Sequence, residues 1–337
     1  MQCMAYNRKK RNGKMRKLEP AVQTMAFALP NGTSTIDLSQ CASLVNRRFY
    51  RQGINWVVSG FRIYKDAAQE SGSTGVIISK LPNTWVMGNA WEKAFRHWQD
   101  LNKRAVEAGE SLPARFTDFK VYMDSTHHTA GKAANLLPAD NSGTTAGAGE
   151  WEYSKIVFPQ SSTIGGSIEA EFIATGANYP GAGASGLDAV SLIEGYAASR
   201  ALPNVVDPNV PNDAQDVDAG TPENWLGAID NEGTTQIGEV ISDLTTENNT
   251  APYPFEGDGT AVDTQYPGGA NQLPGLQIVD AAYFSSGTNS NKLFLKGDNF
   301  PCGLVRITST SATGAVLLVD LVPGTHRGYL CEPMTEM

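Results

Sequence analysis

The distribution of short strand-like segments is the feature that most constrains how this 337-residue chain can fold. These segments are rich in β-branched and aromatic residues, and several alternate apolar with polar residues, which is typical of half-buried β-strands. They occupy residues 53–65, 75–81, 115–123, 151–158, 167–174, 276–284, 292–296, 303–309 and 315–322. Helices do not alternate regularly with them, so the pattern disfavours a parallel α/β sheet. We therefore expect an all-β fold, an eight-stranded antiparallel jelly-roll sandwich with one or two helices and long loops inserted between strands.

Two helices are expected among these strands. Asn89 is a suitable N-cap, and Glu92 three residues later completes a capping-box pattern. Gly109 is a suitable C-terminal stop. The apolar stripe of this helix consists of Trp91, Phe95 and Trp98. Residues 187–200 could form a second helix, which would end before Pro203.

Charge is distributed very unevenly along the chain. The net charge is −9, yet the first 17 residues contain no acid and seven cations, namely Arg8, Lys9, Lys10, Arg11, Lys14, Arg16 and Lys17. The remainder has 19 basic and 35 acidic residues, a net charge of −16. We expect a basic disordered arm at residues 1–35 and a jelly-roll domain at residues 36–337. Within that domain, the acidic residues 203–275 would form surface loops or a further elaboration.

Two basic segments are candidates for binding nucleic acid. A flexible cationic arm pairs with phosphates without sequence preference, and residues 8–11 (RKKR) also resemble a nuclear-import signal. The second segment, residues 46–53 (NRRFYRQG), combines Arg47, Arg48 and Arg51 with two aromatic residues. That composition suits phosphate contact together with base stacking on Phe49 and Tyr50. The alternative is an ordinary strand entry, with both rings in the core and the arginines paired to acids.

Motifs for catalysis, metal binding and membrane insertion are weak. His127 and His128 are adjacent, but no third ligand is placed by spacing, and no nucleophile elbow, phosphate-binding loop or zinc-protease helix occurs. The four cysteines are scattered, which gives no disulfide framework and favours a reducing compartment. No apolar run approaches the roughly 20 residues of a membrane span. We therefore expect no catalytic residue, no metal, no cofactor and no membrane association.

Several stretches together resemble one protein family. They are NRRFYRQGINWVVSGF (46–61), LPNTWVMGNAWEKAFRHWQ (81–99), GEWEYSKIVFP (149–159), LIEGYAASRALPNVVDPNVP (192–211), NNTAPYPF (248–255) and PGTHRGYLCEPM (323–334). They run in order along most of the chain beyond the arm. This combination is similar to the capsid proteins of circular, Rep-encoding single-stranded DNA (CRESS-DNA) viruses from aquatic environments.

The resemblance implies a structural protein rather than an enzyme. It implies a jelly-roll subunit that self-assembles into an icosahedral shell and packages single-stranded DNA through an inward-facing arm. The partners would be other copies of the chain, the genome and a host receptor on the outer surface. The expected locations are the virion and, through the basic segment, the host nucleus.

Three other functions stay open at this point. A capsid protein of a small RNA virus would share both the arm and the jelly roll. A secreted carbohydrate-binding β-sandwich would share the fold, although the chain shows no signal peptide. A metal-dependent hydrolase would use His127, His128 and nearby acids.

Overall fold

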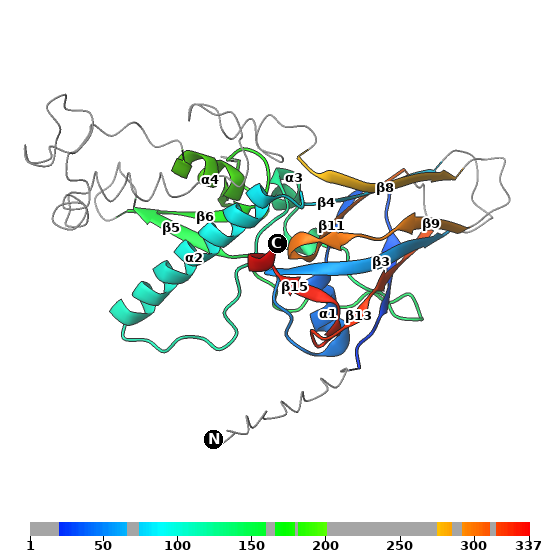
Figure 1. Cartoon of the computed structure of the whole chain (residues 1–337), viewed down its shortest axis with the longest axis horizontal. Coiled ribbons are helices and arrows are strands. Elements are labelled where there is room, and N and C mark those ends of the chain that lie inside the picture. Colours follow the sequence, from blue (N-terminus) through cyan, green and yellow to red (C-terminus); the bar gives the residue numbers. More distant parts are fainter. Residues whose placement is uncertain are drawn as a thin grey trace, which may run out of the picture.

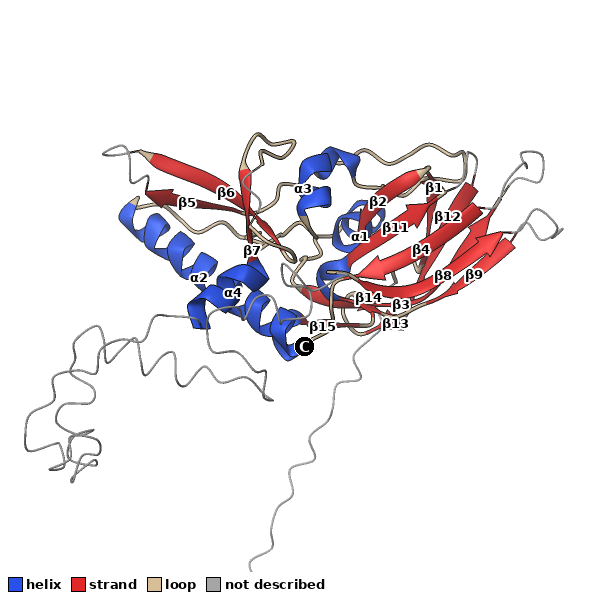
Figure 2. Cartoon of the chain, turned by 90° about the horizontal axis from the view of Figure 1, so that it is seen from above, coloured by secondary structure: helices blue, strands red, loops and turns tan. Residues whose placement is uncertain are grey.

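The computed structural model describes residues 20–65, 74–159, 166–178, 181–200, 275–284, 292–310 and 315–337. These residues are mostly β-sheet, with four α-helices (Figures 1 and 2). The seven cations of the arm, and all but the last residue of the acidic stretch 203–275, lie outside this part of the chain.

The larger sheet has six strands, all antiparallel to their neighbours. Strand β1 pairs with β12, β12 pairs with β3, and β3 also pairs with β9, β10 and β15. Their bounds are β1 Thr24–Leu29, β3 Ile54–Tyr64, β9 Lys292–Lys296, β10 Asn299–Phe300, β12 Ala315–Leu321 and β15 Cys331–Pro333. The long strand β3 therefore lies at the centre of this sheet.

The second sheet has four antiparallel strands in the order β2-β11-β4-β8. Their bounds are β2 Gly32–Asp37, β4 Thr74–Lys80, β8 Gln277–Phe284 and β11 Leu304–Ser309. Figure 1 shows β4 and β8 in one layer and β3 in the other. One apolar core contains the buried residues of both sheets, including Phe27, Trp56, Ile78, Ile307 and Leu317. Burial of these side chains is the main force that holds the two sheets together.

Connections of very different length join the strands. Those from β1 to β2, β3 to β4, β8 to β9 and β11 to β12 are short, whereas α1 (Leu38–Asn46) lies between β2 and β3. The connection from β4 to β8 carries an insertion with its own apolar core (Figure 2). Its elements are α2 Trp85–Ala108, α3 Ser125–Ala130, the 3₁₀ turn η1 Lys132–Ala134, β5 Lys155–Pro159, β6 Ser167–Ile173, β7 Asp188–Ser191 and α4 Leu192–Arg200.

Two smaller features complete the described structure. Strands β5 and β6 pair antiparallel and β6 and β7 pair parallel, which makes a three-stranded sheet in the insertion. Near the C-terminus, β13 (Pro323–Gly324) and β14 (Gly328–Tyr329) form a hairpin. Further 3₁₀ turns are η3 Pro301–Gly303 and η4 Met334–Glu336. None of the helices in the described part of the chain has the length and apolar character needed to cross a bilayer.

Most of the expected strands are confirmed. The segments predicted at residues 53–65, 75–81, 167–174, 276–284, 292–296, 303–309 and 315–322 correspond to β3, β4, β6, β8, β9, β11 and β12. Only the end of segment 151–158 forms a strand, β5. Segment 115–123 forms a single isolated bridge, Tyr122 to Ile173, because its hydrogen bonds go to separate places rather than to one neighbouring strand.

The expected boundary of the arm at residue 35 is wrong. Strand β1 and most of β2 lie within residues 1–35, and each joins a different main sheet. The reason is visible in the sequence of β1, where Met25, Phe27 and Leu29 alternate with smaller or polar residues and all three are buried. The first strand therefore begins at Thr24, twelve residues before the expected start of the domain at residue 36.

The predicted helices also need correction. Helix α2 ends at Gly109 as expected, but it begins after Thr84, whose Oγ1 accepts from the Met87 backbone nitrogen at 3.4 Å, so Asn89 is not its cap. Residues 187–200 form strand β7 before helix α4 begins. Helices α1 and α3 were not predicted, so the described residues contain more helices than the one or two expected.

Candidate nucleic-acid interface

The point where the arm joins the ordered domain is fixed by hydrogen bonds. The Val22 backbone nitrogen donates to Asn46 Oδ1 at 3.0 Å, and Tyr329 Oη donates to the Val22 carbonyl at 2.7 Å. Asn46 Nδ2 in turn donates to Tyr329 Oη at 2.7 Å. The chain at Val22 therefore lies between the end of α1 and strand β14. Residues 1–19 are attached at this place, next to the arginines that follow α1.

Helix α1 brings Arg47 and Arg48 to this place. The helix begins at the cap Asp37 and ends at Arg47, which has a left-handed conformation with φ of 54°. The chain then turns back, and the Tyr50 backbone nitrogen donates to Ser43 Oγ at 3.0 Å. Arg47 is exposed and Arg48 is half-buried. The left-handed residue is what redirects the chain into the basic segment 46–53.

Arg51 and Phe49 meet a second segment that is distant in sequence. The Arg51 guanidinium lies 5.6 Å from the centre of the Phe49 ring, and its Nε donates to the Thr117 carbonyl at 3.3 Å. The Phe49 ring meets the Phe116 ring edge-to-face, with centroids 5.3 Å apart. Arg115 places its guanidinium 5.5 Å from the centre of the Phe116 ring.

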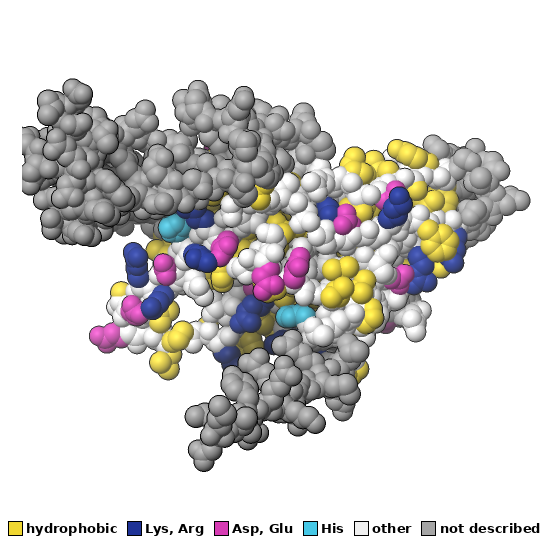
Figure 3. All heavy atoms as spheres, viewed as in Figure 1, with side chains coloured by type: hydrophobic (Ala, Val, Ile, Leu, Met, Phe, Trp, Pro, Cys, Tyr) yellow, Lys and Arg dark blue, Asp and Glu magenta, His cyan; other side chains and the backbone are white. Residues whose placement is uncertain are grey.

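A third segment contributes one more cation. Arg327, in the turn between β13 and β14, donates from Nη1 to the Phe49 carbonyl. We call this group of side chains the arginine–phenylalanine patch; it consists of Arg47, Phe49, Arg51, Arg115, Phe116 and Arg327. Figure 3 shows Lys and Arg side chains gathered below the centre of one face, with acidic side chains bordering them. The patch combines cations with aromatic rings, the combination that binds single-stranded nucleic acid.

Tyr50 does not belong to the patch. Its side chain is fully buried, and its ring packs against Trp56 and Tyr329 with centroid distances of 5.8 and 5.5 Å. Its hydroxyl donates to the Arg327 carbonyl at 3.0 Å. The expected base stacking on Tyr50 is therefore wrong, because this ring is part of the core. The second aromatic ring beside Phe49 is instead that of Phe116, which is 61% exposed.

Gln52 holds the two main segments of the patch together. Its backbone nitrogen donates to Asp118 Oδ2 at 3.1 Å, and its side chain donates to Asp37 Oδ2 at 2.9 Å and accepts from the Val121 backbone nitrogen at 2.6 Å. Burial raises the pKa of Asp37 and of Asp118 to about 6, although hydrogen bonds to both carboxyl groups oppose the shift. This buried network therefore joins the segment that carries Arg51 to the segment that carries Arg115 and Phe116.

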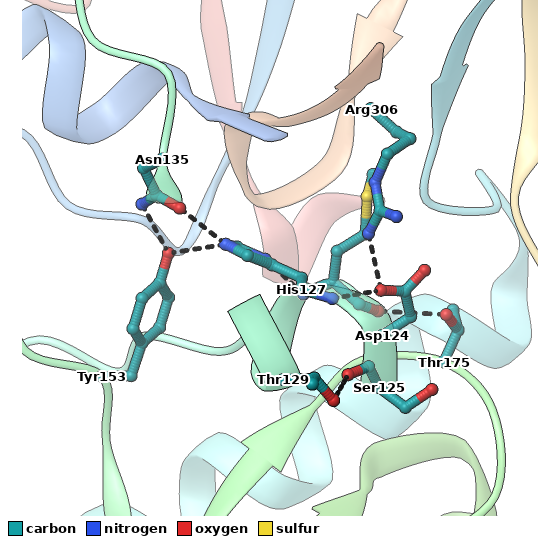
Figure 4. Close-up of polar contacts among 9 residues, drawn as sticks. Asp124, Ser125, His127, Thr129, Asn135, Tyr153, Thr175 and Arg306 are labelled. Atoms are coloured by element: carbon teal, nitrogen blue, oxygen red, sulfur yellow. Dashed lines mark hydrogen bonds and ion pairs between the residues drawn. The ribbon is translucent and has the colours of Figure 1, made fainter. Parts of the chain in front are cut away.

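His127 and His128 are buried and hydrogen-bonded to other residues of the insertion. His127 Nδ1 accepts from the Met123 backbone nitrogen at 3.1 Å, and its Nε2 lies 2.7 Å from Asn135 Oδ1 (Figure 4). Burial lowers the pKa of His127 to about 4, so the ring is neutral and donates from Nε2. His128 Nε2 lies 3.0 Å from Glu171 Oε2. Within the described ranges, no three His, Cys, Asp or Glu side chains are grouped so that they could hold a metal ion.

The sequence identified only part of this interface. Arg47 and Arg48 follow Asn46, which contacts Val22, and the Arg51 guanidinium lies against the Phe49 ring. Arg115, Phe116 and Arg327 were not predicted as site residues. The available signal was the pairing of a cation with an aromatic ring in Arg115–Phe116, but nothing local in the sequence places it against Phe49.

Comparisons with known proteins do not identify the chain: no protein-family model, no curated protein and no solved structure matches it. Function must therefore be inferred from the strand order, the charge distribution and the patch.

Proposed function

We propose that this chain is the capsid protein of a small virus with a single-stranded DNA genome, built on an eight-stranded jelly roll. The observation that carries the proposal is the strand order, β1-β12-β3-β9 in one sheet and β2-β11-β4-β8 in the other. Strand β10 follows β9 after a break of two residues and also pairs with β3, so the two count as one interrupted strand. This winding of successive strands between two facing sheets supports a jelly roll, a fold common in viral capsids.

Electrostatics support the packaging role. Residues 1–17 bring seven cations and no acid, whereas the rest of the chain has a net charge of −16. The first described residues after the arm are held at Val22 against Asn46, which directly precedes Arg47 of the patch. We propose that this region faces the interior of a closed shell, where cations offset the repulsion between genome phosphates. The acidic remainder of the surface would limit binding of nucleic acid elsewhere.

A shell subunit needs no catalytic residue or cofactor, and none is proposed. The partners are other copies of the chain, the DNA genome and a host receptor at the outer surface. The locations are the virion and, through residues 8–11, the host nucleus. A capsid protein of a small RNA virus is the nearest alternative, because neither the arm nor the strand order distinguishes DNA from RNA.

Assembly can be tested with the purified full-length chain. We expect negative-stain microscopy to show closed particles of uniform size, with nucleic acid detected by their absorbance at 260 nm. Deleting residues 1–17 should leave the particles intact and remove most of the nucleic acid. Digestion of the packaged material with deoxyribonuclease or ribonuclease would then separate the DNA from the RNA alternative. A monomer with affinity for glycans would contradict the proposal and favour a carbohydrate-binding sandwich.

A further inference from the structure

We propose that the rings of Phe116 and Phe49, with Arg51 and Arg115 beside them, form a stacking site for unpaired bases of a single-stranded polynucleotide. This inference rests on the proposed packaging function and assigns part of it to particular side chains. The arm alone would bind phosphates and would not distinguish paired from unpaired strands. A stacking site at its attachment point would add that distinction.

The exposure of Phe116 is the first observation in favour of the stacking site. The side chain is 61% exposed and belongs to residues 110–117, all of which are exposed. Its edge-to-face contact with Phe49, at an interplanar angle of 63°, fixes the orientation of the ring without covering it. An ordered aromatic ring in water offers a flat apolar surface, and every nucleobase has a matching face.

Charge is the second observation. The Arg51 and Arg115 guanidinium groups lie 5.6 and 5.5 Å from the centres of the Phe49 and Phe116 rings. A base stacked on either ring would have its phosphate within reach of the neighbouring cation, and Arg47 is exposed nearby. The acid next to this segment, Asp118, has a largely buried carboxylate that accepts from the Gln52 backbone nitrogen. The exposed part of the patch therefore complements a polyanion.

Geometry selects unpaired bases as the ligand. In a duplex both faces of each base are already stacked on neighbours, so a ring at the protein surface cannot reach them. In a single strand the faces are available, and stacking on aromatic side chains strengthens binding regardless of sequence. The ligand class is therefore a single-stranded polynucleotide, read by base faces and phosphates rather than by base edges.

The test compares two oligonucleotides of equal charge with the unassembled full-length chain at nanomolar concentration, so that the patch is not enclosed in a particle. One is oligothymidylate, and the other has the same number of phosphates but abasic sugars. Fluorescence anisotropy should show that Phe116→Ala weakens binding of oligothymidylate about tenfold and leaves binding of the abasic strand unchanged. A Phe116→Trp variant should keep the affinity, and its added fluorescence should be quenched by oligothymidylate only.

Matched controls come from exposed apolar residues outside the patch, one in the same segment as Phe116 (Leu112) and one on β9 (Phe294). Phe294 on β9 is 63% exposed and has the Lys292 ammonium 4.6 Å from its ring centre, so it has a ring and a cation like the patch. Phe294 pairs with Arg62 on β3. Arg62 is eight residues from Ile54, the first residue of β3 after the patch segment, and at about 3.3 Å per residue it lies roughly 26 Å from Ile54. Phe294→Ala and Leu112→Ala should bind oligothymidylate as the unchanged chain does.

The outcomes separate this inference from the proposed function. If the unchanged chain binds both strands and Phe116→Ala has no effect, the stacking site is wrong while packaging stands. If Phe116→Ala weakens both strands equally, the residue acts through structure or charge, and the stacking site is again wrong. If the unchanged chain binds neither strand, the packaging function itself fails.

Discussion

Asp37 is a fully buried carboxyl group that accepts four hydrogen bonds. Its donors are the backbone nitrogens of Ser39 and Gln40, Gln52 Nε2 and Trp151 Nε1, at 2.9 to 3.2 Å. Through Gln52 it belongs to the same network as Asp118, which lies under the patch. A buried network of this kind is costly to leave incomplete, so it fixes its members in one arrangement.

The raised pKa values of these acids predict how stability depends on pH. Burial raises the pKa of Asp118 to about 6, above the roughly 3.9 of an unfolded chain, so the folded state binds this proton more tightly. The resulting stabilisation is complete below about pH 4 and is lost as the pH rises through 6. When the pH falls from 7 to 5, protonation of Asp118 should raise the free energy of unfolding of the unchanged chain by about 1 kcal/mol. Asp118→Asn should abolish this gain.

Urea unfolding at the two pH values measures that difference. Asp140→Asn is a suitable control, because hydrogen bonds from Ser142 and Thr144 lower the pKa of exposed Asp140 and move its titration below this range. The control should keep the pH dependence of the unchanged chain. Identical dependence in Asp118→Asn would contradict the prediction.

Gly303 is a position where only glycine fits. Its φ is +66°, and an added Cβ would lie 2.8 Å from Cδ1 of the buried Trp56 ring and 3.3 Å from Leu38 Cβ. Gly303→Ala should therefore lower the free energy of unfolding by about 3 kcal/mol, partly from the left-handed backbone and partly from overpacking.

A matched variant isolates the steric part of that cost. Gly143 also has a positive φ, +80°, but an added Cβ there would meet no atom within 4 Å. Gly143→Ala should cost about 1 kcal/mol in the same urea titration, from backbone strain alone. Equal losses in the two variants would show that Trp56 does not restrict Gly303.

At the scale of elements, one ion pair joins the insertion to the second sheet. Arg306 on β11 donates from Nη2 to Asp124 Oδ1 at 2.6 Å, and Asp124 is also the N-cap of α3, accepting from the His127 backbone nitrogen at 2.8 Å (Figure 4). The side chains are 7% and 21% exposed. Removing one partner of a largely buried pair leaves the other charge without compensation.

Arg306→Ala should therefore destabilise the chain by about 3 kcal/mol, measured by urea unfolding. The control is Arg62→Ala, which removes the pair between Arg62 and Asp320; those side chains are 32% and 24% exposed. Because solvent screens this second pair, its loss should cost about 1 kcal/mol or less. A larger effect at Arg62 than at Arg306 would contradict the assigned role of the Arg306–Asp124 pair.

Local patterns explain which elements could be predicted from the sequence. In β12, Ala315, Leu317, Val319 and Leu321 alternate into the core, and that alternation was sufficient to predict the strand. Strand β1 has the same pattern, but it closely follows a dense run of cations, and that charge predicts an arm. Helix α2 begins directly after Thr84 because Val86 and Met87, four residues before Ala90 and Trp91, continue its buried face.

The candidate site was predictable only where its residues are adjacent in the chain. Arg47 and Arg51 stand in one polar turn, so their shared location followed from the sequence. The contact between Phe49 and Phe116 joins residues that are 67 positions apart and depends on how the insertion folds. Burial of Tyr50 likewise depends on its packing against Tyr329, near the other end of the chain.

At the scale of the whole molecule, the long and short connections are separated. Four short connections lie at one end of the two main sheets, and α1 and the insertion lie at the other. The attachment of the arm and the patch both lie by the end of α1, on the same side as the long connections. In the proposed shell, the end of the subunit that carries the patch would face the closed interior and the opposite end would face outward.

The salt dependence of binding distinguishes the two cationic parts. Each phosphate neutralised on a single strand contributes about 0.7 to the slope of log affinity against log salt concentration. If all seven arm cations contact phosphates, deleting residues 1–17 should reduce that slope by about 5. Phe116→Ala should lower the affinity for oligothymidylate without changing the slope, because a ring displaces no counterions. Anisotropy titrations at several salt concentrations measure both quantities, and a slope unaffected by the deletion would show that the arm does not hold the polynucleotide.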